Sequence, residues 1–152
     1  MDIFKSFSEI FCDCNKTFNV KEYTGESREI LMNSINENNS GVYILSKKGE
    51  AYPFYIGSAG KIQKNKEKGG RSVRDRLFSA KTPYNIDKEY LLYSPKTSGA
   101  SPEGYNKKIS LSELIIKIIS VKDNISPAAL EHLLLQGFLN EHQRLPEANQ
   151  QL

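Results

Sequence analysis

Residues 41–57, GVYILSKKGEAYPFYIG, contain two runs of strand-forming residues separated by a short polar stretch. Residues 41–46 (GVYILS) and 52–57 (YPFYIG) are rich in β-branched and aromatic side chains, whereas residues 47–50 (KKGE) are typical of a turn. Pro53 favours an edge strand or a bulge at the start of the second run. This stretch therefore predicts a β-hairpin.

A third strand and a long helix are predicted near the end of the chain. Residues 114–121 (LIIKIISV) are apolar and β-branched, which indicates a buried strand. Ser126 and Pro127 supply a helix cap and a first helical residue, so we expect a helix that runs to about His142. Its predicted apolar stripe consists of Leu130, Leu133, Leu134 and Phe138.

The segment between the hairpin and the third strand has two parts. Residues 58–70 form a polar, basic, glycine-containing loop, after which Ser72 and Asp75 suggest the cap of a short helix that packs through Val73, Leu77 and Ala80. Residues 82–112 have little periodicity apart from an apolar patch at residues 90–93. We interpret residues 82–112 as an insertion.

The first forty residues have a helical pattern. Apolar residues between positions 3 and 11 recur at helical spacing, and a second helix is expected over residues 27–37, with Ile30, Leu31 and Ile35 on its inner face. Taken together, the patterns predict an α+β fold with a three-stranded antiparallel sheet flanked by helices. Residues 1–40 would be an N-terminal helical extension packed on the domain formed by residues 41–152.

The composition limits the class of protein. A chain of 152 residues with 38% hydrophobic and 26% charged residues is typical of one globular domain. Because no apolar run is long enough to cross a bilayer and the N-terminus lacks the basic start of a signal peptide, we expect a cytoplasmic protein without membrane contact. Cys12 and Cys14, far from His132 and His142, are a weak signal for either a disulfide or a zinc site.

Positive charge is concentrated in one part of the chain. The net charge is only +3, yet residues 61–81 contain eight basic residues and two acidic ones. Such a block is typical of a surface that contacts nucleic-acid phosphates, although a solvated loop is the simpler alternative. The residues predicted to contact DNA are Lys61, Lys64, Lys66, Lys68, Arg71 and Arg74.

Five short features occur in a fixed order. GVY at residues 41–43 is followed twelve residues later by YIG at residues 55–57, then by Arg76 in a helix, Glu131 early in the last helix, and Asn149 after Pro146. Over residues 41–149 this order resembles the GIY-YIG nuclease family. The resemblance implies DNA cleavage with one divalent metal ion, Mg²⁺ or Mn²⁺, bound by Glu131. It also implies a catalytic group composed of Tyr43, Tyr55, Arg76, Glu131 and Asn149.

The chemistry of these residue types suits phosphodiester hydrolysis. Glu131 lies at the border of an apolar stripe, where a carboxylate is costly without a partner, although a surface glutamate is the alternative. Arginine holds two phosphate oxygens at once through its planar fork. Arg74 and Arg71 compete with Arg76 for this role. Because Arg74 and Arg76 flank the apolar stripe of their helix on opposite sides, we expect only one of them to face the site.

The roles of the tyrosines and the asparagine follow from the resemblance. Proposals for the family differ on which tyrosine accepts a proton from water; we favour Tyr43, with Tyr55 orienting the phosphate. A phenol has an ordinary pKa of about 10, so this role requires a nearby cation. Asn149 would hydrogen-bond within the site and order the chain end, with Asn140 as a weaker candidate.

One position departs from the family pattern. Many members have a histidine or tyrosine one turn after the arginine, where this chain has Ala80. The compact chain is most similar to the restriction-endonuclease branch, which implies a type II enzyme that acts on double-stranded DNA, with a homodimer as a possible active form. The alternatives are a structure-specific repair or mobile-element nuclease, and a non-catalytic nucleic-acid-binding protein on a decayed fold.

Overall fold

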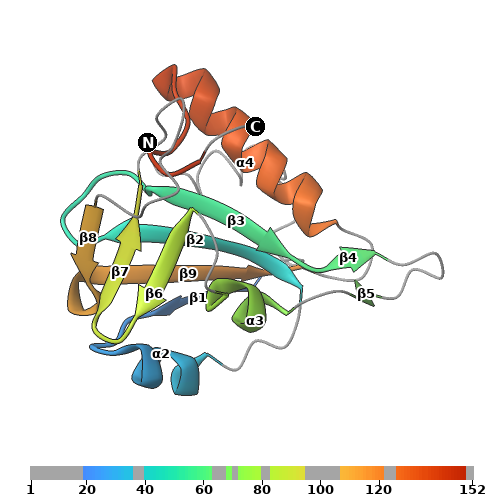
Figure 1. The fold of residues 1–152 in the computed structure, drawn as a ribbon. Coiled ribbons are helices and arrows are strands. Elements are labelled where there is room, and N and C mark those ends of the chain that lie inside the picture. The colour runs from blue at the N-terminus through green and yellow to red at the C-terminus, as the bar shows by residue number, and fades with distance from the viewer. Residues whose placement is uncertain are drawn as a thin grey trace.

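The structure, a computed structural model, describes residues 19–35, 40–62, 68–69, 72–79, 83–94, 107–121 and 126–149. Within these ranges the fold is α+β, as predicted, with a four-stranded and a three-stranded antiparallel sheet and a two-stranded ribbon. Figure 1 shows the two larger sheets facing each other, with α4 (Pro127–His142) on the opposite side of the four-stranded sheet. No helix of the described segments is long and apolar enough to cross a membrane.

The predicted hairpin forms the centre and one edge of the four-stranded sheet. Strand β2 (Gly41–Lys47) pairs with β3 (Tyr55–Ala59), and Tyr43 lies opposite Gly57. The second strand begins at Tyr55 rather than at residue 52, since Pro53 has no backbone N–H to give to a ladder. The backbone N–H of Phe54 already donates to the Leu45 carbonyl at 2.9 Å, which fixes the entry into β3.

The sheet has four strands instead of three. Its order is β1-β9-β2-β3, in which β9 (Leu114–Ser120) is the predicted third strand and β1 (Asn19–Tyr23) adds an edge strand that the sequence analysis missed. The sequence of β1, NVKEY, is almost entirely exposed, so it lacks the apolar alternation that indicates a strand. Its place is determined by backbone pairing with β9. The predicted helix at residues 3–11 and both cysteines lie outside the described residues.

Two short helices begin after serine caps, of which Ser72 was predicted. Helix α2 (Arg28–Ser34) starts after Ser27, whose hydroxyl accepts from the Ile30 N–H, and is shorter than the predicted span of residues 27–37. Helix α3 (Val73–Leu77) starts after Ser72, whose hydroxyl accepts from the Asp75 N–H. Both caps satisfy N–H groups that a helix leaves without an internal partner.

The segment interpreted as an insertion contains a second sheet. Strands β6 (Tyr84–Asp87), β7 (Tyr90–Tyr93) and β8 (Lys107–Ser110) form an antiparallel meander, followed by a 3₁₀ turn, η1 (Leu111–Glu113). The buried side chains of this sheet belong to the same core as Tyr43 and Leu45. The segment is therefore a structural layer. Its strands were missed because each has only four residues, which is too short for a clear period-2 signal.

The two faces of the main sheet are covered by different elements. The face that carries Tyr43 packs against α2, α3 and the second sheet, and the face that carries Val42 and Ile44 packs against α4. The buried stripe of α4 contains Leu135, whereas the predicted Leu133 is 37% exposed. Positions 133 and 135 flank the stripe on opposite sides, so the tilt of α4 on the sheet decides which of them is buried.

Candidate functional site

Three tyrosines from three strands meet on one face of the main sheet. Tyr43 of β2 and Tyr55 of β3 have ring centroids 6.0 Å apart, and Tyr84 of β6 lies 6.4 Å from the first and 5.3 Å from the second. Tyr43 is hydrogen-bonded to the side chains of both others. The Tyr84 hydroxyl also donates to the Leu77 carbonyl at 2.8 Å. Tyr84 was not among the predicted site residues, because only the second sheet brings it here.

Gly57 makes room for the tyrosine cluster. A Cβ at this position would lie 2.6 Å from Tyr43 Cζ and 2.8 Å from Tyr55 Cε1, closer than real Cβ contacts allow. The last residue of the YIG motif therefore has a steric role that the sequence pattern alone does not explain. The tyrosine ring occupies the space in which any other residue would place its side chain.

We expect Gly57→Ala to destabilise the protein by about 1–3 kcal/mol, because the new methyl group must displace Tyr43 in a packed core. Gly137→Ala in α4 is the matched control, since a Cβ there meets nothing within 4 Å and should add about 0.5–1 kcal/mol through helix propensity. Urea unfolding of both variants measures the difference. Equal stability of Gly57→Ala and the wild type would contradict the packing described here.

Glu131 approaches the tyrosines from the other face of the sheet. It projects from the first turns of α4 and is half-buried, and its carboxylate is hydrogen-bonded to the Ser58 side chain. Ser58 lies opposite Val42, on the α4 side of β3. The charge of Glu131 raises the pKa of Tyr43 and of Tyr55, which lie on the other face of the sheet. Burial raises the pKa of the carboxyl group above its ordinary value, and the Ser58 hydrogen bond and Arg76 oppose this shift.

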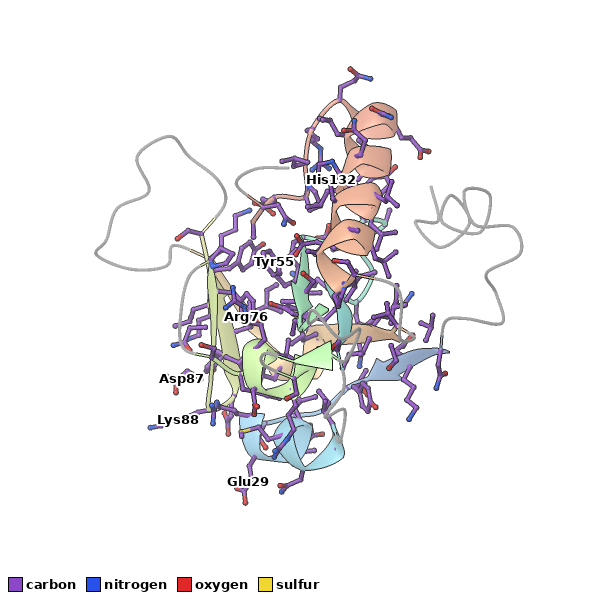
Figure 2. All side chains as sticks on the ribbon, turned by 90° about the vertical axis from the view of Figure 1, so that its right-hand side faces the viewer. Glu29, Tyr55, Arg76, Asp87, Lys88 and His132 are labelled. Atoms are coloured by element: carbon purple, nitrogen blue, oxygen red, sulfur yellow. The ribbon has the colours of Figure 1, made fainter. Side chains whose placement is uncertain are left out.

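Arg76 is the arginine that faces the site. It is exposed on α3, and its charge acts on Glu131 and on the tyrosines of the cluster. Figure 2 shows Arg76 and Tyr55 between α3 and α4. Arg74 points elsewhere, because its Nε donates to the Met32 carbonyl at 3.0 Å and ties α3 to the end of α2. Arg74 is thus held by α2, and the choice of Arg76 as the phosphate-binding arginine stays a prediction.

The electrostatics single out Tyr43 among the three phenols. Burial raises the pKa of Tyr43, of Tyr55 and of Tyr84. Hydrogen bonds from Tyr84 and Tyr55 lower the pKa of Tyr43, whereas the hydrogen bond with Tyr43 raises the pKa of each partner. Burial outweighs these contacts, so the pKa of Tyr43 still lies above its ordinary value. Ionisation near neutral pH still requires a cation beside it.

Asn149 holds the edge of β3. Its Oδ1 accepts from the Ile56 N–H at 2.9 Å and its Nδ2 donates to the Ile56 carbonyl at 2.8 Å, so the side chain pairs with the strand as another backbone would. The Ala148 N–H also donates to the Phe54 carbonyl at 2.7 Å. Asn149 is buried. Its partner Ile56 lies between Tyr55 and Gly57 in the chain. Asn140, the weaker candidate, hydrogen-bonds Gln136 on the exposed surface of α4.

The predicted DNA-contacting residues are only partly described. The backbones of Lys61 and Lys68 lie in a two-stranded ribbon formed by β4 (Lys61–Ile62) and β5 (Lys68–Gly69), directly after β3. Lys64, Lys66, Arg71 and Ala80 lie outside the described residues. The ribbon extends from the end of β3 at which Ser58 lies, beyond the body of the fold (Figure 1).

The donor groups suit only certain metal ions. The described part of the chain contains no group of three or more His, Cys, Asp or Glu side chains that would enclose a metal. Glu131 is a single carboxylate near phenol oxygens, and Mg²⁺ is often bound by one or two carboxylates while it keeps several water molecules. The residues therefore fit Mg²⁺ or Mn²⁺ better than a structural zinc ion, which requires four protein ligands.

Comparison of the chain with protein-family models, curated proteins and solved structures finds no match. The functional argument therefore depends on the chemistry of the site itself and on the resemblance of its ordered motifs to the GIY-YIG nucleases.

Proposed function

We propose that this protein is a GIY-YIG-like endonuclease that hydrolyses phosphodiester bonds in DNA. The observation that carries the proposal is the meeting of Tyr43, Tyr55 and Tyr84 on one face of the sheet, where the charges of Arg76 and Glu131 act on Tyr43. Phosphodiester hydrolysis requires a proton acceptor, a phosphate-binding cation and a metal ligand.

Glu131 is the residue that would hold the metal ion. A bound Mg²⁺ or Mn²⁺ would neutralise charge on the phosphate and on the departing oxygen. The raised pKa of Glu131 supports this role, because a desolvated carboxylate gains more from a cation than a solvated one does. The Ser58 hydrogen bond fixes the orientation of the carboxylate.

The reaction then divides among the residues of the chain. The Arg76 guanidinium binds two non-bridging oxygens of the phosphate, for which its exposed position is suitable. Tyr43 accepts a proton from the water molecule whose oxygen attacks phosphorus, and the Tyr55 hydroxyl stabilises the phenolate by a hydrogen bond. The bond from phosphorus to the 3′-oxygen breaks, and that oxygen takes a proton from solvent. Tyr55, half-buried at the rim of the cluster, orients the phosphate.

Double-stranded DNA is the proposed substrate, and the basic residues of positions 61–74 would contact its backbone. We extend the proposal to a type II restriction enzyme that acts as a homodimer, with each site cutting one strand. The second sheet and the β4–β5 ribbon flank the site and are suitably placed to select the sequence (Figure 1).

Incubation of supercoiled plasmid with the protein and Mg²⁺ or Mn²⁺ tests the function. We expect nicked and linear products that disappear in EDTA, because no residue of the site replaces the metal ion. Sequencing of the product ends then separates the subtypes: fixed ends indicate restriction-like specificity, and scattered ends at branches or lesions indicate repair. Binding without nicking in any divalent metal would show a non-catalytic binding protein instead.

A further inference from the structure

A turn that follows α4 connects the edge of the main sheet with the second sheet. This post-α4 turn (residues 146–149) is closed by a hydrogen bond of 2.9 Å from the Asn149 N–H to the Pro146 carbonyl. Glu147 is one of its two central residues, as a bond between residues i and i+3 requires. Asn149, whose amide pairs with Ile56, is thus joined to Glu147 through a short hydrogen-bonded piece of backbone.

The post-α4 turn holds β3 on both sides of Tyr55. The Ala148 N–H donates to the carbonyl of Phe54, which precedes Tyr55, at 2.7 Å. The Asn149 side chain makes two hydrogen bonds with Ile56, the residue that follows Tyr55, at 2.9 and 2.8 Å. A shift of this turn would therefore move the backbone that carries Tyr55 in the tyrosine cluster.

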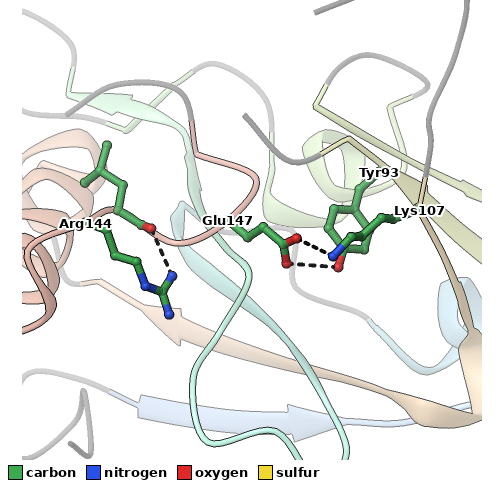
Figure 3. Close-up of polar contacts among 5 residues, drawn as sticks. Tyr93, Lys107, Arg144 and Glu147 are labelled. Atoms are coloured by element: carbon green, nitrogen blue, oxygen red, sulfur yellow. Dashed lines mark hydrogen bonds and ion pairs between the residues drawn. The ribbon is translucent and has the colours of Figure 1, made fainter. Parts of the chain in front are cut away.

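Glu147 attaches the post-α4 turn to the second sheet. Its carboxylate accepts hydrogen bonds from the Tyr93 hydroxyl at 3.2 Å and from Lys107 Nζ at 2.5 Å, as Figure 3 shows. Tyr93 lies on β7, and Lys107 lies directly opposite it on β8. The Tyr93 ring also stacks on the Phe54 ring, with 4.6 Å between their centroids. The second sheet therefore contacts the start of β3 directly through Phe54 and indirectly through Glu147.

Burial decides which of the two contacts of Glu147 matters more. The side chains of Lys107 and Glu147 are 49% and 35% exposed, and an exposed ion pair adds little to stability. Tyr93, in contrast, is only 6% exposed, and a buried tyrosine hydroxyl usually requires a partner. Burial, together with the charge of Glu147, raises the pKa of Tyr93 to about 12, so its hydroxyl remains a donor. Removal of the carboxylate would take the acceptor away from this hydroxyl.

We infer that Glu147 is a positioning residue for Tyr55. By accepting the hydrogen bond from Tyr93 it fixes the post-α4 turn, and this turn holds Tyr55 at its distance of 6.0 Å from the Tyr43 ring. The inference depends on the proposed function, because the proposed reaction uses the Tyr55 hydroxyl beside Tyr43. Glu147 itself binds neither the phosphate nor the metal ion in that reaction.

Fluorine NMR of the protein labelled with 3-fluorotyrosine tests the position of Tyr55 without DNA or metal. The chain has eight tyrosines, and Tyr55→Phe identifies the signal of Tyr55. We expect Glu147→Ala to shift or broaden this signal, because the turn loses its attachment to the second sheet. Tyr93→Phe should have the same effect, although it keeps the ring that stacks on Phe54. Glu147→Gln retains an oxygen acceptor for Tyr93 and should restore the wild-type signal.

Single-turnover cleavage of a saturating duplex measures the consequence for the reaction. We expect Glu147→Ala to cut about tenfold more slowly, because a small displacement of a reacting group is costly, and Glu147→Gln to recover most of the rate. DNA affinity in EDTA should stay within about twofold of the wild type, since the lost interaction acts on the transition state. Glu141→Ala is the matched control, because Glu141 is exposed on α4. Thermal melting checks that each variant is folded.

The outcomes separate this inference from the proposed function. An unchanged Tyr55 signal in Glu147→Ala, or a changed signal with wild-type cleavage, would overturn the role of Glu147 and leave the nuclease in place. An equal loss of rate in Glu141→Ala would overturn it as well. A wild-type protein that leaves DNA intact in every divalent metal would overturn the proposed function, and the role of Glu147 with it, whatever the fluorine spectra show.

Discussion

Glu131→Gln is expected to reduce DNA cleavage by about 10³-fold or more, because it removes the only carboxylate of the proposed site and with it the metal ion. Glutamine keeps the size of the side chain and a hydrogen bond to Ser58. It also removes a charge whose burial is unfavourable, as the raised pKa of Glu131 indicates. The melting temperature should therefore not fall. Single-turnover cleavage of a labelled duplex and thermal melting measure the two effects.

Glu141→Gln is the matched control, since Glu141 lies on the same helix and is exposed. We expect its cleavage rate to equal that of the wild type. If Glu131→Gln cuts DNA normally in Mg²⁺, Glu131 is not the metal ligand and the proposed mechanism is wrong.

Arg76→Ala is expected to lower cleavage by about 10²- to 10³-fold, because the guanidinium stabilises negative charge that grows in the transition state. DNA affinity should stay within about tenfold of the wild type, since the ground-state duplex has many other contacts. Arg76 is exposed and no hydrogen bond to it is needed for the fold, so stability should change little. Cleavage rates and anisotropy measured on the same preparation separate the two effects.

Arg74→Ala gives the contrasting result. Loss of its hydrogen bond to the Met32 carbonyl should destabilise the protein by about 1 kcal/mol, because a partly buried acceptor loses its partner. Cleavage per folded molecule should be close to that of the wild type. The opposite pattern, with turnover lost in Arg74→Ala and kept in Arg76→Ala, would assign the catalytic arginine to position 74.

An edge strand organises the whole site. The tyrosine cluster lies on one face of the sheet and Glu131 comes from the helix on the other face, with β3 at the edge of the sheet. An open edge is also a surface on which other strands tend to pair. Asn149 occupies part of that edge through its two hydrogen bonds to Ile56. Its structural role thus explains why an asparagine near the chain end belongs with the tyrosines.

Tyr84 is a candidate to replace the side chain that Ala80 lacks. Many family members have a proton-handling side chain one turn after the arginine, whereas this chain has Ala80. The hydroxyl of Tyr84 is hydrogen-bonded to Tyr43 from the second sheet. We expect it to supply the hydrogen-bonding group that Ala80 lacks.

The sequence by itself determined the local elements. Runs of β-branched and apolar residues placed β2 and β9, Ser126 and Pro127 started α4, and Ser72 started α3, because strand-forming runs and caps are properties of neighbouring residues. The YIG motif also placed Tyr55 and Gly57 on one face of a strand. The resemblance to the GIY-YIG nucleases supplied the candidate residues. Neither the motifs nor the spacing of apolar residues showed which of these side chains lie close together.

Only the tertiary structure decided the contacts between distant segments. The pairing of β1 with β9, the hydrogen bond of Arg74 to Met32, the position of Tyr84 and the contact of Glu131 with Ser58 all depend on elements far apart in the chain. Such contacts arise from the packing of whole layers and from backbone hydrogen bonds. Layer packing and backbone hydrogen bonds between strands produce no repeating pattern in the local sequence. The sequence alone therefore does not show which residues lie together in the candidate site.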